Sequence, residues 1–179
     1  MKTKLISAVI FTGAAMASQF AAAADGTITF NGTITAQTCT INGNGSGSSN
    51  FTITLPTVSS STLATAGQTA GRTPFSIALT NCTPNSGNVR TYFESGPTTD
   101  LTTGNLILNA GGATNVEIGL LNSDLTNIAA GAAEASQNSK PVAITGGKAT
   151  LNYYAQYVSI GAATAGAANS SVMYTMAYQ

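Results

Sequence analysis

Apolar and polar residues alternate at both ends of this chain. Near the start, one face of the alternating stretch carries only glycine and apolar residues, and the other carries threonine and asparagine. The first of these faces consists of Gly26, Ile28, Phe30, Gly32 and Ile34. A second alternating stretch, which precedes Gln179, has on one face Val172, Tyr174, Met176 and Tyr178. Because a period of two is typical of a strand with one buried face, the pattern predicts a β-strand at each end.

Neither terminal strand has a neighbouring segment in the sequence with which it would pair. Unpaired edge strands normally promote aggregation. If the two edges are instead complementary parts of one joint, one copy of the chain lends its first strand to the sheet of the next copy. The pattern therefore suggests polymerisation.

Five further segments have the composition of strands, and most of them alternate with period two. They are residues 51–55, 74–80, 89–93, 115–121 and 149–158. Clusters of Gly, Asn, Ser and Pro separate these segments, and residues 60–66 could form one short turn of helix. Many short strands with turn signals between them predict an all-β sandwich of the immunoglobulin-like kind.

Two lysines, an apolar run and a stretch of small residues open the chain in that order. This three-part pattern predicts a signal peptide at residues 1–24, with cleavage after Ala24 or, nearly as well, after Ala23. A retained membrane anchor is the alternative, but such a span needs about 20 apolar residues. The remaining residues, 25–179, are enough for one domain.

Charge is scarce in the predicted mature chain. Four basic and six acidic residues remain, which gives a net charge of −2. Nucleic-acid binding needs a basic surface, so nucleic acid is not expected as a partner. Charged residues make up 7% of the whole chain, far below the roughly 25% of ordinary globular proteins. A surface of small and uncharged polar residues suits an exported protein that packs against copies of itself.

The residues that usually carry catalysis are missing or scattered. The chain has no histidine, which is the usual general base near neutral pH. Neither a Gly-x-Ser-x-Gly nor a Ser-x-x-Lys motif occurs, and the few carboxylates lack the spacing of metal ligands. Enzyme activity, a metal and a cofactor are therefore not expected. A sugar-binding platform of Tyr153, Tyr154 and Tyr157 is an alternative, although alternation places Tyr154 on the opposite face and tyrosine is common in half-buried strands.

The chain has two cysteines, Cys39 and Cys82. In an exported protein the simplest prediction is one disulfide between them. Two buried free thiols and an intermolecular bond are the alternatives. A catalytic dithiol is less favoured, because the Cys-x-x-Cys spacing is missing.

A stretch rich in glycine and alanine, residues 160–169, lies between two predicted strands. Its position favours a connecting loop whose small side chains allow a neighbour to approach closely. A mobile loop without any partner is the alternative. A second stretch, residues 43–49, is rich in Gly and Ser and is a better candidate for flexibility.

Three parts of the sequence resemble the chaperone-usher pilins, most closely the major subunits of type 1 fimbriae. Residues 26–39 are similar to the donor strand of that family and its continuation into the first cysteine. Residues 154–179 are similar to its last two strands, and residues 71–75 to its approach to the second cysteine. The middle of the chain, residues 85–148, is similar only in pattern.

The resemblance implies an incomplete immunoglobulin-like sandwich of six strands, whose seventh strand comes from another subunit. It divides the chain into a signal peptide (1–24), a donor-strand extension (25–36) and a pilin domain (37–179). A hydrophobic groove would lie beside the last strand, and its edge would include Val172, Tyr174, Met176, Tyr178 and Gln179. A periplasmic chaperone would fill the groove and hold the carboxylate of Gln179. At an outer-membrane usher, residues 26–34 of the next copy would replace the chaperone, as in other cases of strand addition.

The expected function is then a structural subunit of a bacterial fimbria that supports cell adhesion. It would be exported through the periplasm to the cell surface and would contact other copies of itself and other pilins of the fibre. A minor adaptor pilin of the same organelle is the close alternative. A secreted monomeric binding module, in which residues 26–34 fold back onto their own sheet, is the alternative from another class.

Overall fold

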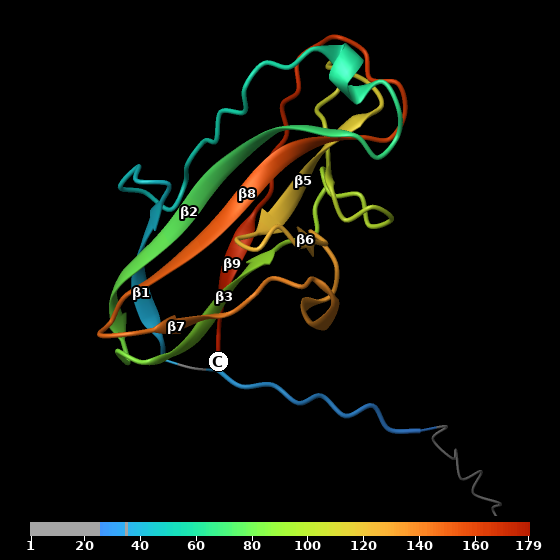
Figure 1. The fold of residues 1–179 in the computed structure, drawn as a ribbon. Helices are drawn as coiled ribbons and strands as arrows, with labels where there is room; N and C mark the ends of the chain where they lie inside the picture. Colours follow the sequence, from blue (N-terminus) through green and yellow to red (C-terminus); the bar gives the residue numbers. More distant parts are fainter. Residues whose placement is uncertain (1–25, 35) are drawn as a thin grey trace, which may run out of the picture. The chain divides into compact units, whose positions relative to one another are not determined.

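The computed structural model describes residues 26–34 and 36–179, so the predicted signal peptide lies outside the described residues. The chain divides into two compact units, with the boundary after Ile34. In the first unit, residues 26–34 form no strand, so the strand that their alternation predicts is not formed within the single chain. The second unit contains nine strands and two short 3₁₀ helices, which Figure 1 shows in sequence colours. They are β1 (Thr38–Gly43), η1 (Ser60–Leu63), β2 (Thr69–Thr83), β3 (Gly87–Phe93), β4 (Leu106–Ile107), β5 (Val116–Asn122), β6 (Asn127–Ile128), η2 (Glu134–Ser136), β7 (Val142–Ile144), β8 (Ala149–Ser159) and β9 (Tyr174–Tyr178).

The strands form two antiparallel sheets. The larger sheet has the order β1-β2-β8-β5-β4, with β6 paired to β5, and the smaller sheet has the order β7-β3-β9. In Figure 1 the long strands β2 and β8 run side by side, and β9 lies beside β3. The predicted all-β sandwich is therefore confirmed. Six strands have five or more residues (β1, β2, β3, β5, β8 and β9), and the other three have only two or three.

Alternating side chains of the long strands form the core between the sheets. In β2, the inward residues Phe75, Ile77 and Leu79 are buried, as the period of two predicts. Tyr153 of β8 is 2% exposed, and its hydroxyl donates a hydrogen bond to Thr91 Oγ1 at 3.0 Å. This tyrosine is a core residue, so the three tyrosines of β8 do not form an exposed platform for sugars.

The loop at residues 160–169 packs closely against residues 109–115, as the small side chains predict. Backbone hydrogen bonds join Ala113 N to Ala167 O and Asn109 N to Asn169 O, both at 2.8 Å. A Cβ atom at Gly112 would lie 2.2 Å from the carbonyl oxygen of Ala167. The close approach of these two segments therefore depends on the missing side chain.

One buried side chain acts as a substitute for a strand partner. Gln137 is 1% exposed; its Oε1 accepts a hydrogen bond from Phe93 N at 2.7 Å, and its Nε2 donates one to Phe93 O at 2.8 Å. Its carboxamide thus satisfies both backbone groups of the last residue of β3. Buried backbone groups need such partners.

We expect Gln137→Leu to lower the free energy of unfolding by about 1–3 kcal/mol, because it leaves the buried N–H of Phe93 without a partner. The carbonyl oxygen of Phe93 keeps a second hydrogen bond, from Gly131 N at 3.1 Å. Urea denaturation of the exported chain measures this loss. Ser136→Ala at the neighbouring exposed position is the control and should change the stability by less than about 0.5 kcal/mol. Equal stabilities for the two variants would show that the Phe93 groups find water instead.

Candidate functional site: an open apolar groove

A groove of about 880 Å³ opens between the two sheets. Its floor consists of core residues from both sheets, including Ile77, Phe93, Ile118 and Leu120. Its two walls come from segments that are far apart in the sequence. Phe51, Ile53 and Leu55 form one wall, and Val172, Tyr174, Met176 and Tyr178 form the other. Among the residues that the structure describes, no charged side chain lines the groove.

The first wall was predicted to be a strand at residues 51–55, and this prediction is wrong. The segment has the alternation of a strand, since Phe51, Ile53 and Leu55 are half-buried while Thr52 and Thr54 are exposed. However, among the described residues no backbone–backbone hydrogen bond reaches residues 51–58. A strand is defined by its pairing, so a segment with the right side chains and no partner is not one. The polar backbone of this wall is thus available to an added strand.

The second wall is β9, the last strand of the smaller sheet, together with Val172 just before it. Within the described part of the chain β9 pairs on one edge only, with β3, where Met176 lies opposite Thr91 and Tyr178 opposite Val89. The predicted strand began at Val172, whereas β9 begins at Tyr174. Four of the five predicted edge residues line the groove; the fifth, Gln179, exchanges two backbone hydrogen bonds with Asn88 instead.

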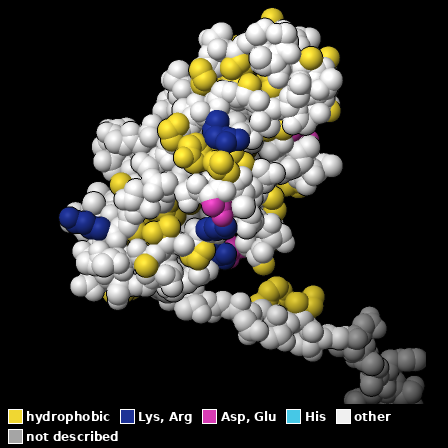
Figure 2. Space-filling view, in the orientation of Figure 1, with side chains coloured by type: hydrophobic (Ala, Val, Ile, Leu, Met, Phe, Trp, Pro, Cys, Tyr) yellow, Lys and Arg dark blue, Asp and Glu magenta, His cyan; other side chains and the backbone are white. Residues whose placement is uncertain are grey.

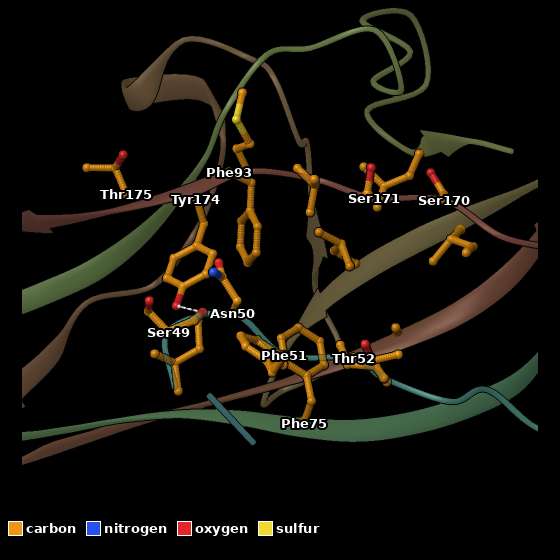
Figure 3. Close-up of a pocket in the computed structure, with 18 of the residues that line it drawn as sticks. Ser49, Asn50, Phe51, Thr52, Phe75, Phe93, Ser170, Ser171, Tyr174 and Thr175 are labelled. Carbon is orange, nitrogen blue, oxygen red and sulfur yellow. Dashed lines mark hydrogen bonds between the residues drawn. The ribbon is translucent and has the colours of Figure 1, made fainter. Parts of the chain in front are cut away.

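The two walls meet at one point of the groove. The Tyr174 hydroxyl donates a hydrogen bond to Ser49 O at 2.7 Å, and Figure 3 shows this bond beside the ring of Phe51. The ring centroids of Phe51 and Tyr174 are 6.1 Å apart, and those of Phe51 and Phe75 are 6.2 Å apart. Burial raises the pKa of Tyr174 and of Tyr178 above 10.0, so both hydroxyls stay protonated and uncharged at neutral pH.

We expect Tyr174→Phe to loosen the first wall, because it removes the hydrogen bond from the Tyr174 hydroxyl to Ser49 O while it keeps the ring. The loss in stability should be about 1 kcal/mol. Limited proteolysis with chymotrypsin should cleave after Phe51 and Leu55 faster than in the wild type, while β2 stays intact. Tyr92→Phe, on the neighbouring strand β3, is the matched control and should leave cleavage at these two positions unchanged. Faster cleavage in both variants would contradict a specific tether.

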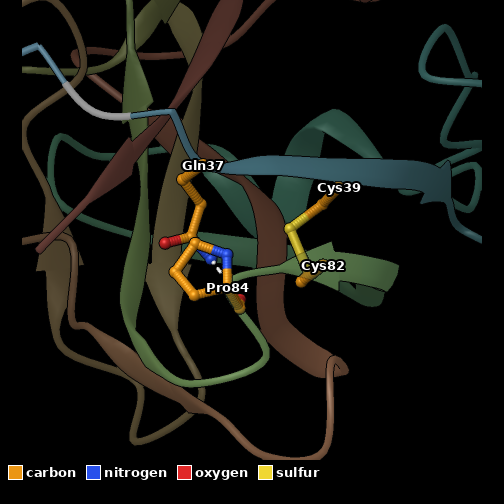
Figure 4. Close-up of a disulfide and its surroundings, with 4 residues drawn as sticks. All are labelled: Gln37, Cys39, Cys82 and Pro84. Atoms are coloured by element: carbon orange, nitrogen blue, oxygen red, sulfur yellow. Dashed lines mark hydrogen bonds between the residues drawn. A yellow bond between two sulfur atoms is a disulfide. The ribbon is translucent and has the colours of Figure 1, made fainter.

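The predicted disulfide between Cys39 and Cys82 is present (Figure 4). It joins β1 to β2, two strands that also pair in antiparallel register. Beside it, Gln37 Nε2 donates a hydrogen bond to Pro84 O at 3.0 Å. Ile41 of β1 and Ile77 of β2 line the groove. The covalent bond thus connects the two strands that carry part of the groove floor.

The predicted donor segment, residues 26–34, exposes its apolar side chains. Ile28 is 80% exposed, Phe30 is 88% exposed, and Ile34 is fully exposed. Figure 2 shows apolar side chains gathered on this segment and few charges on the visible face of the protein. Exposed large apolar side chains in a row mark an interaction site.

Sequence reasoning missed the floor of the groove and the role of residues 51–55. Leu106, Ile118 and Leu120 come from the middle of the chain, where the resemblance was only one of pattern. The alternation of Phe51, Ile53 and Leu55 is typical of a strand, but it contains no signal that the partner strand is absent. The described part of the chain contains no helical segment with the length and hydropathy of a membrane span.

An all-β sandwich with an open groove between an unpaired segment and its last strand is the architecture of a pilin-type subunit. Comparison with known families agrees: residues 55–179 match the family described as FimA, Type-1 fimbrial protein, A. The chain belongs to this family of structural fimbrial proteins and is a fimbrial subunit.

Relatives with known names cover nearly the whole chain. The sequence is 54% identical over 162 residues to the major fimbrial subunit SMF-1 of Stenotrophomonas maltophilia (strain K279a), covering 87% of this chain and 94% of that protein. It is 48% identical over 172 residues to the F17 fimbrial protein of Escherichia coli, covering 93% of this chain and 94% of the relative.

Solved structures show the same fold. The P pilus rod subunit PapA superposes with a TM-score of 0.59 at 24% identity, covering 79% of this chain and 99% of PapA. A subunit from a chaperone-usher pilus structure superposes with a TM-score of 0.60 at 24% identity, covering 87% of this chain and 96% of that subunit. At this identity the likeness concerns the fold alone.

Proposed function

We propose that the chain polymerises by strand donation, in which residues 26–34 of one copy fill the groove of the next. The observation that carries this proposal is the pair of unpaired walls: residues 51–58, which lack backbone hydrogen bonds, and β9, which pairs on one edge only. An added strand between them would supply both walls with backbone partners.

The donor segment has the side chains that such a groove requires. Ile28, Phe30 and Ile34 share one face of an extended segment, and each would contribute about 1.5–3 kcal/mol when it is fully buried. The described residues that line the groove are apolar or polar but uncharged, and the donor segment also carries no charge. The two surfaces therefore match in polarity as well as in periodicity.

Gly32 is the one inward position between Phe30 and Ile34, and it brings no side chain. We assign it to the part of the groove beside Tyr174 and Phe51, whose rings approach each other there. On this assignment a bulky residue at position 32 blocks assembly, whereas it leaves folding unaffected, since a Cβ at Gly32 meets no atom within 4 Å.

The same groove would be occupied before assembly. We propose a periplasmic chaperone as the first occupant, with basic residues that bind the carboxylate of Gln179, and an outer-membrane usher as the place of exchange. This places the subunit in a fimbria on the cell surface, where it serves a structural and not a catalytic role in adhesion. The disulfide would hold β1 and β2 in place while the sandwich is one strand short.

The role of major subunit is supported by the similarity to the major fimbrial subunit SMF-1. A second candidate, a minor adaptor pilin, is supported by 34% identity over 168 residues to the minor fimbrial subunit HifD of Haemophilus influenzae, covering 87% of this chain and 75% of HifD. Quantitative immunogold labelling separates them, because a major subunit labels the whole fibre and an adaptor labels only its tip or base.

The test of strand donation is deletion of residues 26–34 in cells that express the intact secretion locus. Surface material is then compared on gels with SDS and without boiling. The intact chain should give a ladder of multimers and the deletion only monomer. If both chains stay monomeric and equally soluble, strand donation is contradicted and a secreted monomeric binding module becomes the better explanation.

A further inference from the structure

The donor segment contains a chemical feature that the proposed joint does not use, the dipeptide Asn31-Gly32. We propose that Asn31 is a site of spontaneous deamidation, and that its isoaspartyl product removes the ability of unassembled subunits to donate a strand. This inference rests on the proposed function, because it concerns the same segment. It assigns to the chain a built-in limit on the lifetime of free subunits.

The reaction needs only the chain and water. The backbone nitrogen of Gly32 attacks the side-chain carbonyl carbon Cγ of Asn31, a new N–Cγ bond forms, and the amide nitrogen leaves as ammonia after it takes up the proton of the backbone nitrogen. Water then opens the five-membered succinimide at one of its two carbonyls. Opening at Cγ gives aspartate, and opening at the backbone carbonyl gives isoaspartate, in which the main chain runs through Cβ.

The local structure at Asn31 favours this attack. Both residues of the dipeptide are exposed, and residues 26–34 form no strand. A Cβ atom at Gly32 would meet no heavy atom within 4 Å, so nothing crowds the attacking nitrogen. Within this segment no hydrogen bond holds the Asn31 carboxamide or the Gly32 N–H. Glycine also allows the backbone torsions that ring closure requires.

A second Asn-Gly pair in the chain is protected by the fold. The Asn42 carboxamide oxygen accepts a hydrogen bond from Gly47 N at 2.9 Å, and the N–H of Gly43 donates one to Ser48 O at 2.8 Å. Gly43 is also buried, at the end of β1. Both reacting groups are therefore occupied, and ring closure at Asn42 requires local opening first.

A third pair, Asn44-Gly45, supplies an internal control. It is exposed in the turn that follows β1, and no described residue accepts a hydrogen bond from Gly45 N. Neither residue of this pair lines the groove, and the pair lies outside the donor segment. Deamidation there should therefore proceed without any effect on strand donation.

Isoaspartate at position 31 would disrupt the donor strand itself. It adds one atom to the main chain between Phe30 and Gly32, so residues on the two sides of it no longer keep a common period of two. Ile28 and Phe30 then cannot share a face with Ile34, because a slip in the alternation turns side chains to the opposite face. In a fibre, by contrast, the segment would be a paired strand, in which hydrogen bonds restrain its backbone.

The experiment ages the exported soluble chain and intact fibres side by side at mildly alkaline pH. Peptide mapping and labelling with isoaspartyl methyltransferase locate the product, and the ladder that each aged chain forms by itself, compared with that of the fresh chain, measures its ability to assemble. The variants are Asn31→Gln and the matched control Asn44→Gln. In the soluble chain, isoaspartate should form at least about tenfold faster at Asn31 than at Asn42, since two hydrogen bonds restrain Asn42.

The expected pattern has three parts. Fibres should be modified at Asn44 but not at Asn31. Among the aged soluble chains, the wild type and Asn44→Gln should both lose the ability to form a ladder. Asn31→Gln should retain it. Equal rates at Asn31 and Asn42 in the soluble chain would overturn the inference, as would equal loss of assembly in Asn31→Gln and the wild type. A fresh chain that forms no ladder would contradict strand donation instead, so the two failures are distinguishable.

Discussion

Phe30→Asp is expected to abolish the SDS-resistant ladder of surface multimers while the subunit still folds. Phe30 is 88% exposed in the free chain, so folding should not depend on its side chain. In the filled groove, the substitution removes about 1.5–3 kcal/mol of apolar burial and adds the cost of burying an unpaired carboxylate. A total of about 3 kcal/mol or more corresponds to a loss of at least about 100-fold in strand-exchanged pairs.

The matched control is Thr29→Asp, the same charge one residue earlier. Alternation places Thr29 on the outward face of the donor strand, so this variant should keep its ladder. Both variants should be recovered from the periplasm in similar amounts. If Thr29→Asp also loses the ladder, charge in this segment, and not the face on which it lies, determines the result, and the proposed register is wrong.

Removal of the disulfide, in the variant Cys39→Ala with Cys82→Ala, is expected to lower the free energy of unfolding by about 4 kcal/mol. The bond spans 43 residues, and cross-linking a loop of that size removes chain entropy from the unfolded state. A free energy of this size is a large fraction of the stability of a small domain. The stability of the variant should therefore be too low for its delivery to the cell surface, and its amount in the periplasm should drop sharply.

Urea denaturation of the oxidised wild type, the reduced wild type and the double alanine variant measures this effect. The reduced wild type should resemble the variant, because both lack the same cross-link. The sandwich should otherwise be retained, since β1 and β2 also pair through backbone hydrogen bonds. A loss below about 1 kcal/mol would contradict the prediction and would assign the stability of this edge to strand pairing.

The sequence predicted secondary structure best where the spacing of apolar residues within one segment determines its conformation. Strands β2, β3, β5 and β8 were predicted, because each has alternation or apolar runs of the length that a strand needs, and η1 falls within the predicted turn of helix. The predicted β9 was correct except for its first two residues, Val172 and Met173. The cysteine pair followed from the oxidising compartment that the signal peptide predicts.

Features that depend on partners distant in the sequence could not be predicted. Residues 51–55 have the side-chain pattern of a strand, but the rest of the fold decides whether a segment is paired. No strand in the described part of the chain pairs with this segment. The short strands β4 and β6 have two residues each, too few for any period to appear. Gln137 satisfies the backbone of Phe93 across 44 positions, and no local signal distinguishes it from an exposed glutamine.

The uncharged lining of the groove has a consequence for the environments in which a fibre could persist. Dissolved ions screen interactions between charges, but neither the groove nor residues 26–34 carry one. Burial of apolar surface weakens little with ionic strength, and kosmotropic salts strengthen it. The joint between subunits should therefore hold equally in fresh water, in brine and in body fluids. A bacterium that carries such fibres could move between habitats of very different salinity without the fibres coming apart.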